Sequence, residues 1–222
     1  MFKAALFDLD GVVFDTEPQY SVFWGSVCRQ YHPEIPGLEH MIKGQTLTQI
    51  FDGHFNGMTD AQRDIVTRLD EFEGQMSYDY VKDFPSFVRQ LRDHGVKTAL
   101  VTSSNKMKMD AVLRARPEVA ELFDEMLMAE DFSESKPSPD CYLKAAKRLQ
   151  ADICECVVFE DSFNGLRSGR SAGMVVVGLS TTNPAEKIAP LCDVVVPDYT
   201  LLDITQCEKL LRERNNTTKT NG

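Results

Sequence analysis

The sequence predicts an α/β protein built on a doubly wound parallel sheet, with an all-helical segment inserted after the first strand. Three observations support this fold class. Six short apolar runs are continuous rather than alternating, which is typical of strands covered on both faces. Helical patterns separate most of these runs, and strand–helix alternation produces a parallel sheet. The span from Pro18 to Tyr80 contains no predicted strand.

The predicted strands and helices alternate along most of the chain. The strands are expected at Lys3–Phe7, Val96–Thr102, Glu125–Met128, Cys156–Phe159, Met174–Val177 and Asp193–Val196. The helices between them are expected at Pro85–Asp93, Lys106–Arg114, Pro139–Leu149 and Phe163–Ala172. A helix-stop signal, His94-Gly95, precedes the second strand.

The insert after the first strand is predicted to be entirely helical. Its apolar spacing indicates helices at Gln19–Tyr31 and Thr59–Tyr80, with a shorter one at Thr48–Phe55. We therefore divide the chain into an α/β core domain, residues 1–15 and 83–210, and a helical domain, residues 16–82. The polar residues 211–222 predict a disordered tail.

Composition limits the classes of function. The 222 residues are 42% hydrophobic and 26% charged, which is ordinary for a folded protein. The formal net charge of −10 disfavours binding to nucleic acid or to an anionic membrane surface. No apolar run has the length of a membrane span, and the first residues lead directly into a strand. We expect a cytoplasmic monomer or weak homo-oligomer without a signal peptide.

The cysteines do not indicate a metal or disulfide framework. The chain has six cysteines but no CxxC pair, and its four histidines are scattered. A zinc site is therefore not expected. We interpret the cysteines as reduced, mostly buried thiols.

Polar residues with catalytic potential follow four of the predicted segments. In open parallel sheets, ligands bind beyond the carboxyl ends of the strands. The residues found at these positions are Asp8, Asp10 and Gly11 after the first strand, Thr102, Ser103 and Ser104 after the second, Lys136 after the third, and Glu160, Asp161, Ser162, Asn164 and Gly165 after the fourth. We expect them to meet at one edge of the sheet.

These residue types suit phosphoryl transfer. Crowded carboxylates are costly unless a cation joins them, and Mg²⁺ prefers oxygen ligands. Such a cation attracts a phosphate dianion, which Lys136 and Thr102 could hold. In-line transfer to a carboxylate would then form an aspartyl phosphate.

Each motif taken alone also has a structural explanation. Asp-x-Asp-Gly occurs in capped turns and calcium loops, and a single lysine such as Lys136 is usually a surface residue. Thr102 could bond its own backbone, and Glu160-Asp161 could favour a helix N-terminus. Four motifs in order, each near a predicted strand end, favour a common site over these explanations.

Together the motifs resemble those of the haloacid dehalogenase superfamily of phosphotransferases. FDLDGVVFDTEP is similar to the first motif of that family, LVTSS to the second, SKPSPDCY to the third and VVFEDSFNG to the fourth. The resemblance covers about residues 1–205. The helical insert resembles the cap domain of the subgroup that includes β-phosphoglucomutase and related sugar-phosphate phosphatases, and we call it the cap below.

The resemblance implies a role for each core residue. Asp8 would be the nucleophile. Asp10 would act as a general acid and then as a base, protonating the leaving oxygen and later activating water or a second hydroxyl. Thr102, Ser103 and Lys136 would hold the phosphoryl group.

The resemblance also implies a Mg²⁺ cofactor. Its ligands would be Asp8, the backbone carbonyl of Asp10 and Asp161, with Glu160 close by. Members that act on halides do not need a metal. The presence of Asp10 and of the Glu160-Asp161 pair therefore favours phosphate chemistry.

The cap residues bear on which reaction is catalysed. In the loop HMIKGQTLTQI, Lys43 and Gly44 match a pair that contacts substrate in the mutase. The position of the arginine that grips the second phosphate there holds Leu47, or nearby Thr46 or Thr48, and a histidine of the mutase is replaced by Tyr20. Losing an arginine fork weakens the grip on a bisphosphate. Lys43, Gly44 and Tyr20 remain candidate substrate-binding residues.

Three functions follow, in order of preference. The first is a Mg²⁺-dependent phosphatase of small phosphorylated metabolites, sugar phosphates among them. The second is a mutase of the β-phosphoglucomutase type. The third is a non-enzymatic phospho-aspartate signalling domain, which the inserted cap and the acid–base partner Asp10 disfavour. In each case the partner is a small phosphorylated molecule or phosphoryl donor.

Overall fold

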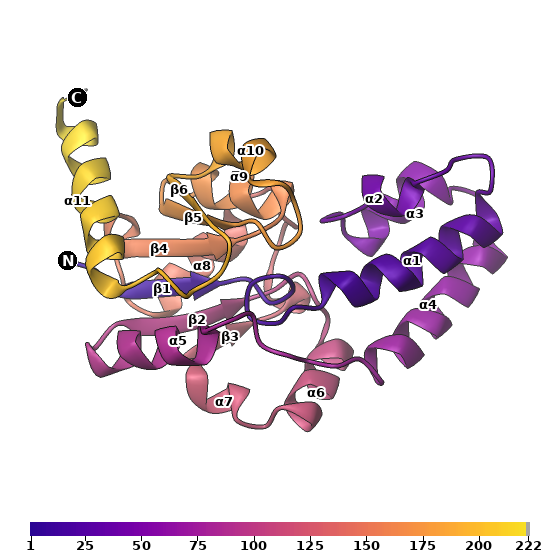
Figure 1. Ribbon diagram of the computed structural model, residues 1–222, viewed down its shortest axis with the longest axis horizontal. Helices are drawn as coiled ribbons and strands as arrows, with labels where there is room; N and C mark the ends of the chain where they lie inside the picture. Colours follow the sequence, from indigo (N-terminus) through magenta and orange to yellow (C-terminus); the bar gives the residue numbers. More distant parts are fainter. Residues whose placement is uncertain (221–222) are drawn as a thin grey trace.

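The computed structural model describes the backbone of residues 1–220 and the side chains of residues 1–216. It contains one parallel sheet of six strands in the order β3-β2-β1-β4-β5-β6 (Figure 1). The strands are β1 (Ala4–Phe7), β2 (Lys97–Val101), β3 (Glu125–Leu127), β4 (Cys156–Glu160), β5 (Val175–Leu179) and β6 (Val194–Val196). The doubly wound α/β fold predicted from the sequence is confirmed.

Helices cover both faces of the sheet, which explains the continuous apolar strands. Along β1, Ala5 and Phe7 enter one buried cluster, and Ala4 and Leu6 enter the other. The first cluster also contains residues of α5 (Phe84–Asp93), α6 (Lys106–Ala115), α7 (Val119–Leu122) and α11 (Ile204–Thr220). The second contains residues of α8 (Asp140–Arg148), α9 (Phe163–Ser171) and α10 (Ala185–Ile188). Since successive strand residues face opposite sides, both sides must be apolar.

The inserted segment forms its own helical unit beside the carboxyl ends of the strands (Figure 1). Its helices are α1 (Glu17–Tyr31), α2 (Leu38–Met41), α3 (Leu47–His54) and α4 (Thr59–Glu73). They share a separate hydrophobic cluster that includes Trp24, Phe55 and Ile65. All buried members of that cluster lie within residues 16–82, the range that we propose for the cap.

Two chain segments connect the cap to the core. The residues after Gly11 lead into α1, and the residues after Tyr78 return to the core. The segments pair through a backbone bridge between Phe14 and Tyr80 and through a hydrogen bond from the Asp15 amide to the Asp79 carbonyl (2.8 Å). This pairing corrects one boundary. The prediction extended a helix to Tyr80, but α4 ends at Glu73 because the chain must turn at Gly74 and run extended into the junction.

The predicted disordered tail is wrong for residues 211–220, which continue helix α11. The polar sequence hides an apolar stripe, because Cys207 and Leu211 are buried against the sheet. Polar contacts add to this packing. The Arg214 guanidinium lies 3.2 Å from the Asp193 carboxylate, and the Asn215 side chain donates to the Cys154 carbonyl at 3.1 Å. Residues 221 and 222 lie outside the described part of the chain.

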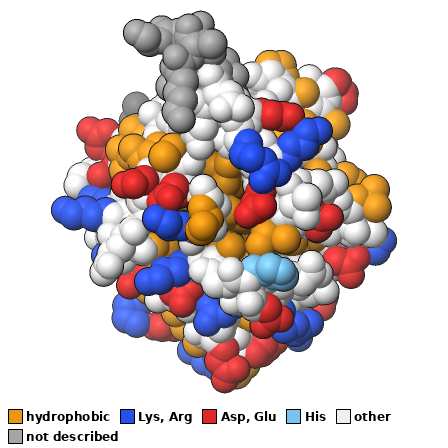
Figure 2. All heavy atoms as spheres, turned by 90° about the vertical axis from the view of Figure 1, so that its left-hand side faces the viewer, with side chains coloured by type: hydrophobic (Ala, Val, Ile, Leu, Met, Phe, Trp, Pro, Cys, Tyr) orange, Lys and Arg blue, Asp and Glu red, His pale blue; other side chains and the backbone are white. Residues whose placement is uncertain are grey.

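The face of the molecule opposite the cap carries acidic and basic side chains interspersed with hydrophobic ones (Figure 2). Within the described residues, no helix combines the length and hydropathy needed to cross a bilayer. All six cysteines are unpaired, and four of them are buried.

Candidate active site

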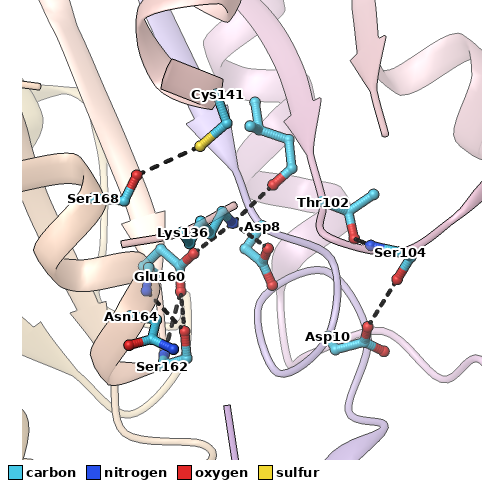
Figure 3. A network of polar contacts seen from close by, with 12 residues as sticks. Asp8, Asp10, Thr102, Ser104, Lys136, Cys141, Glu160, Ser162, Asn164 and Ser168 are labelled. Carbon is cyan, nitrogen blue, oxygen red and sulfur yellow. Dashed lines mark hydrogen bonds and ion pairs between the residues drawn. The ribbon is translucent and has the colours of Figure 1, made fainter. Parts of the chain in front are cut away.

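The sheet order brings the predicted strand-end residues to one place. Strand β1 lies between β2 and β4, so the chain winds in opposite directions on its two sides, and ligands of such folds bind at this switch point. Asp8 follows β1, Thr102 follows β2, and Glu160 and Asp161 mark the end of β4. Figure 3 shows Lys136 between Asp8 and Glu160, with Thr102 to one side. One carboxylate oxygen of Asp161 lies within 4.8 Å of oxygens of Asp8 and Glu160.

Lys136 joins the ends of three strands. Its ammonium group donates to Asp8 Oδ1 (2.6 Å), to Glu160 Oε1 (2.7 Å) and to the carbonyl of Val101 (3.0 Å). The Lys136 ammonium group also lies over the Tyr142 ring, 5.0 Å from the ring centroid. Burial alone would lower the pKa of Lys136, but Asp8 and Glu160 raise it well above its ordinary value. The lysine is therefore a fixed positive charge.

Both carboxylate oxygens of Glu160 already have protein partners. Oε1 accepts from Lys136 and from the Tyr142 hydroxyl (2.8 Å), while Oε2 accepts from the amides of Asp161 (3.0 Å) and Ser162 (3.2 Å). The carboxylate lies directly against helix α9, because a Cβ at Gly165 would stand 1.8 Å from Oε1. Glycine at this helical position is what permits the fully buried glutamate.

Asp161 is buried at the start of the loop that enters α9. Its Oδ2 accepts a hydrogen bond from the Thr182 hydroxyl, and its backbone carbonyl accepts from Asn183 (3.1 Å). Gly11 adopts a φ of 72° beside it, and a Cβ there would stand 2.1 Å from Asp161 Oδ2. The turn after β1 can therefore approach Asp161 only because residue 11 is glycine.

The carboxylates of Asp8, Glu160 and Asp161 could hold a metal ion. One oxygen from each lies within 4.8 Å of the others. Burial raises the pKa of Asp8 to about 7, with Glu160 and Asp10 acting in the same direction against Lys136. Burial, followed by Glu160 and Asp8, raises the pKa of Asp161 well above its ordinary value. A hard divalent cation would remove this repulsion, so the donor set fits Mg²⁺.

Asp10 is held by residues from several segments. The Thr16 hydroxyl donates to Asp10 Oδ1 at 2.6 Å, and Ser104 lies 3.5 Å from Oδ2. Lys108 Nζ also bonds Oδ2 and is only 5% exposed. The sequence motifs did not identify Lys108. Its partner is 98 residues away in the chain, so no local pattern could have pointed to it.

The second motif contributes the hydroxyl side chains of Thr102 and Ser103, which differ in burial. Thr102 is 2% exposed and its Oγ1 accepts from the Ser104 amide at 3.0 Å. Ser103 is more exposed, and both residues line the cavity described next. The Thr102 hydroxyl oxygen thus accepts one local hydrogen bond, as expected for a hydroxyl that shapes a tight turn.

A cavity of about 470 Å³ lies between the core motifs and the cap. All three candidate cap residues line it, as does Leu47. The Lys43 ammonium lies 3.7 Å from the Glu17 carboxylate. Gly44 lies against the fourth motif, where its carbonyl accepts a hydrogen bond from Asn164 (3.3 Å). The Tyr20 hydroxyl donates to Glu73 (2.7 Å), so it already has a partner within the cap.

Comparison with known proteins agrees with this geometry. A sequence profile of the haloacid dehalogenase-like hydrolases matches residues 2–173. A β-phosphoglucomutase of Bacillus subtilis is 27% identical over 82% of this chain and 85% of its own. A validoxylamine A 7'-phosphate phosphatase of Streptomyces hygroscopicus subsp. limoneus is 28% identical over 90% of this chain and 95% of its own.

Two further similarities extend over most of the chain. A bifunctional riboflavin kinase/FMN phosphatase of Arabidopsis thaliana is 28% identical over 91% of this chain, which spans only 54% of that protein's length. Among solved structures, a family IA, variant 3 hydrolase of Entamoeba histolytica superposes with a TM-score of 0.84 at 21% identity, covering 95% of this chain and all of the other. This last similarity supports the fold.

The profile match covers more than half of the chain, and the fold and the strand-end residues agree with it. The protein is therefore an enzyme of the haloacid dehalogenase-like hydrolase family.

Proposed function

We propose that this enzyme is a Mg²⁺-dependent phosphatase that acts on small phosphorylated metabolites through a phosphorylated Asp8. The observation that carries the proposal is the position of Asp8. It follows the central strand, contacts the ammonium group of Lys136, lies with one oxygen within 4.8 Å of an Asp161 carboxylate oxygen, and lines a cavity large enough for a metabolite. Membership in a hydrolase family disfavours a non-enzymatic signalling domain.

Asp8, Asp161 and the backbone carbonyl of Asp10 would hold Mg²⁺. The ion supplies charge neutralisation for the phosphate dianion when bound. We assign Glu160 a supporting position next to the metal, because both of its oxygens already accept hydrogen bonds from the protein. Its function would be to fix Lys136 and the loop that carries Asp161.

In the first chemical step, a carboxylate oxygen of Asp8 attacks phosphorus and the bond to the ester oxygen breaks. Lys136, Thr102 and Ser103 would hold the phosphoryl oxygens in line. Asp10 donates a proton to the departing oxygen. In the second step, Asp10 takes a proton from water, which attacks the phosphorus of the aspartyl phosphate and releases inorganic phosphate.

The cap would select the substrate. The cavity volume suits a sugar phosphate or a molecule of similar size, and two relatives are named as phosphatases of FMN and of validoxylamine A 7'-phosphate. We assign Lys43, Gly44 and Tyr20 to contacts with the departing group, because all three line this cavity. We also propose that the enzyme acts in the cytoplasm as a monomer or weak homo-oligomer.

A mutase of the β-phosphoglucomutase type is the second candidate. The observation that favours it is the Lys43-Gly44 pair, which lies on the cavity wall against the fourth motif. Leu47 also lines the cavity where an arginine would grip a second phosphate. Without that fork, water is the favoured acceptor.

Phosphorus NMR distinguishes the two candidates. The protein is mixed with Mg²⁺ and β-glucose 1-phosphate, primed with a trace of the bisphosphate. A phosphatase releases free phosphate here or from other members of a phosphoester panel. Accumulation of glucose 6-phosphate would establish the mutase instead. Failure to turn over any phosphoester would contradict both.

A further inference from the structure

Lys108 is a buried lysine that the proposed mechanism does not yet use. It stands in the first turn of α6, a core helix, and its side chain is 5% exposed. An ammonium group at such a site is costly unless it is paired. Its pairing partner is Asp10, the proposed acid and base, which lies 98 residues away in the sequence.

The cap supplies the other side of this lysine's environment. The Lys108 ammonium lies 4.8 Å from the ring centroid of Tyr20, in α1. The Tyr20 hydroxyl donates a hydrogen bond to Glu73 in α4, and this bond holds the ring in its position beside Lys108. Burial raises the pKa of Glu73, and the charge of Lys108 opposes that effect. A continuous series of contacts thus runs from Glu73 through Tyr20 and Lys108 to Asp10.

We propose that Lys108 is a positioning residue that orients the Asp10 carboxyl group toward the departing oxygen, and that Tyr20 of the cap holds Lys108 in that place. The inference rests on the proposed phosphatase, in which Asp10 protonates the leaving group.

The two oxygens of Asp10 explain why a second anchor matters. Thr16 fixes Oδ1 at 2.6 Å, but one bond leaves the carboxyl group free to rotate about it. Lys108 fixes Oδ2, where Ser104 contributes only a long contact of 3.5 Å. Proton transfer requires a donor within hydrogen-bond reach of its target, so loss of this orientation should slow protonation.

The origin of the two anchors links catalysis to the cap. Thr16 precedes the first cap helix, and Lys108 is stacked on a cap tyrosine. Both anchors of Asp10 therefore depend on the cap being seated on the core.

The test compares two substrates of similar shape. The phenolate that leaves phenyl phosphate is basic and needs a proton from the enzyme. The p-nitrophenolate that leaves p-nitrophenyl phosphate is much less basic and departs without one. For a double-displacement enzyme, kcat/KM reports only the steps through departure of that group. In Lys108→Met, we expect kcat/KM for phenyl phosphate to fall about 10-fold or more relative to that for p-nitrophenyl phosphate, a part of the effect of full acid catalysis. The ratio does not depend on the fraction of folded enzyme.

Further variants separate positioning from folding. Lys108→Arg should restore part of the ratio, and Tyr20→Leu should reduce it in the direction of Lys108→Met. The matched control is Lys106→Met, which removes a 71%-exposed lysine of the same helix that pairs with Asp110 and should leave the ratio unchanged.

The inference would be overturned if Lys108→Met left the ratio of the two kcat/KM values unchanged while Asp10→Asn lowered it. That outcome would leave the proposed function intact. An unchanged ratio in Asp10→Asn, or no hydrolysis of either compound by the wild type, would instead count against the proposed function. Equal losses for both substrates in Lys108→Met would show a structural effect and also overturn the inference.

Discussion

At the residue scale, the site is dominated by Asp8. This carboxylate is 15% exposed, contacts one ammonium group and faces two other carboxylates. Lys136 brings one positive charge to the three carboxylates of Asp8, Glu160 and Asp161, and it forms ion pairs with both Asp8 and Glu160. The repulsion that remains between these carboxylates does not stabilise the fold. The arrangement therefore favours a function in which an added cation and a phosphate bind here.

We expect Asp8→Asn to fold normally and to lose at least about a thousandfold in turnover, because removing a nucleophile removes the covalent route. Turnover is measured with the best substrate of the phosphoester panel, and folding by the melting temperature. Asp60→Asn, which changes a fully exposed cap carboxylate, is the matched control. Substantial turnover by Asp8→Asn, free of contaminating enzyme and of deamidation, would argue against an aspartyl phosphate on this residue.

Metal binding at Asp8 should depend on pH. In the metal-free protein the pKa of Asp8 is about 7, above the ordinary value of 3.8. The stability that comes from this shift is therefore present below about pH 3.8 and is lost as the pH rises through about 7. Mg²⁺ binds the deprotonated carboxylate and should raise the melting temperature more at about pH 8 than at about pH 5.5.

This prediction is checked by thermal unfolding in excess Mg²⁺ and in excess EDTA at both pH values. Turnover should also stop in EDTA. Asp8→Asn should show a smaller difference between the two pH values. An equal Mg²⁺ effect at the two pH values, or full activity in EDTA, would contradict the metal assignment.

At the scale of the elements, substitution by alanine should have opposite effects on stability at two helical glycines. Gly165 in α9 leaves space for Glu160, whereas a Cβ added at Gly53 in α3 would have no other atom within 4 Å. Alanine normally stabilises a helix by about 0.5–1 kcal/mol relative to glycine. We expect Gly53→Ala to follow this rule.

Gly165→Ala should instead lower the free energy of unfolding and the activity, because its methyl group would displace the Glu160 carboxylate from Lys136 and the Asp161 loop. Denaturant unfolding and kcat/KM of both variants provide the measurement. A Gly165→Ala protein that is as stable and as active as Gly53→Ala would show that the close packing of α9 on Glu160 is unimportant.

At the scale of the whole molecule, one small polar contact joins the fourth motif of the core to the cap. The Asn164 side chain at the start of α9 donates to the Gly44 carbonyl and to Gln49 Oε1, both at 3.3 Å. Gln49 also completes the capping box with Thr46 that begins α3. The fourth motif of the core thereby holds the cap loop that lines the cavity.

We expect Asn164→Ala to raise KM about 2- to 10-fold, which corresponds to the loss of one net hydrogen bond, with little change in melting temperature. Steady-state kinetics with the best panel substrate measures this effect. Gln49→Ala combined with Asn164→Ala should add less than the sum of the single changes. Full additivity would indicate that the two side chains do not act together.

The sequence by itself determined the sheet and the four core motifs. Continuous apolar runs specify strands that are covered on both sides, and the polar residues directly after them are placed by the strand ends. These are local signals, because the pattern and the residue that it positions are neighbours in the chain. The apolar pattern alone therefore places Asp8, Thr102 and Asp161 at one edge of the sheet.

Only the tertiary structure decided the contacts that join distant segments. The stacking of Lys108 on Tyr20 and its pairing with Asp10 depend on how the cap sits on α6. The C-terminal helix forms because Leu211 finds a buried surface, which its polar neighbours do not reveal. Such contacts have no sequence period, since their energy comes from partners that only folding brings within reach.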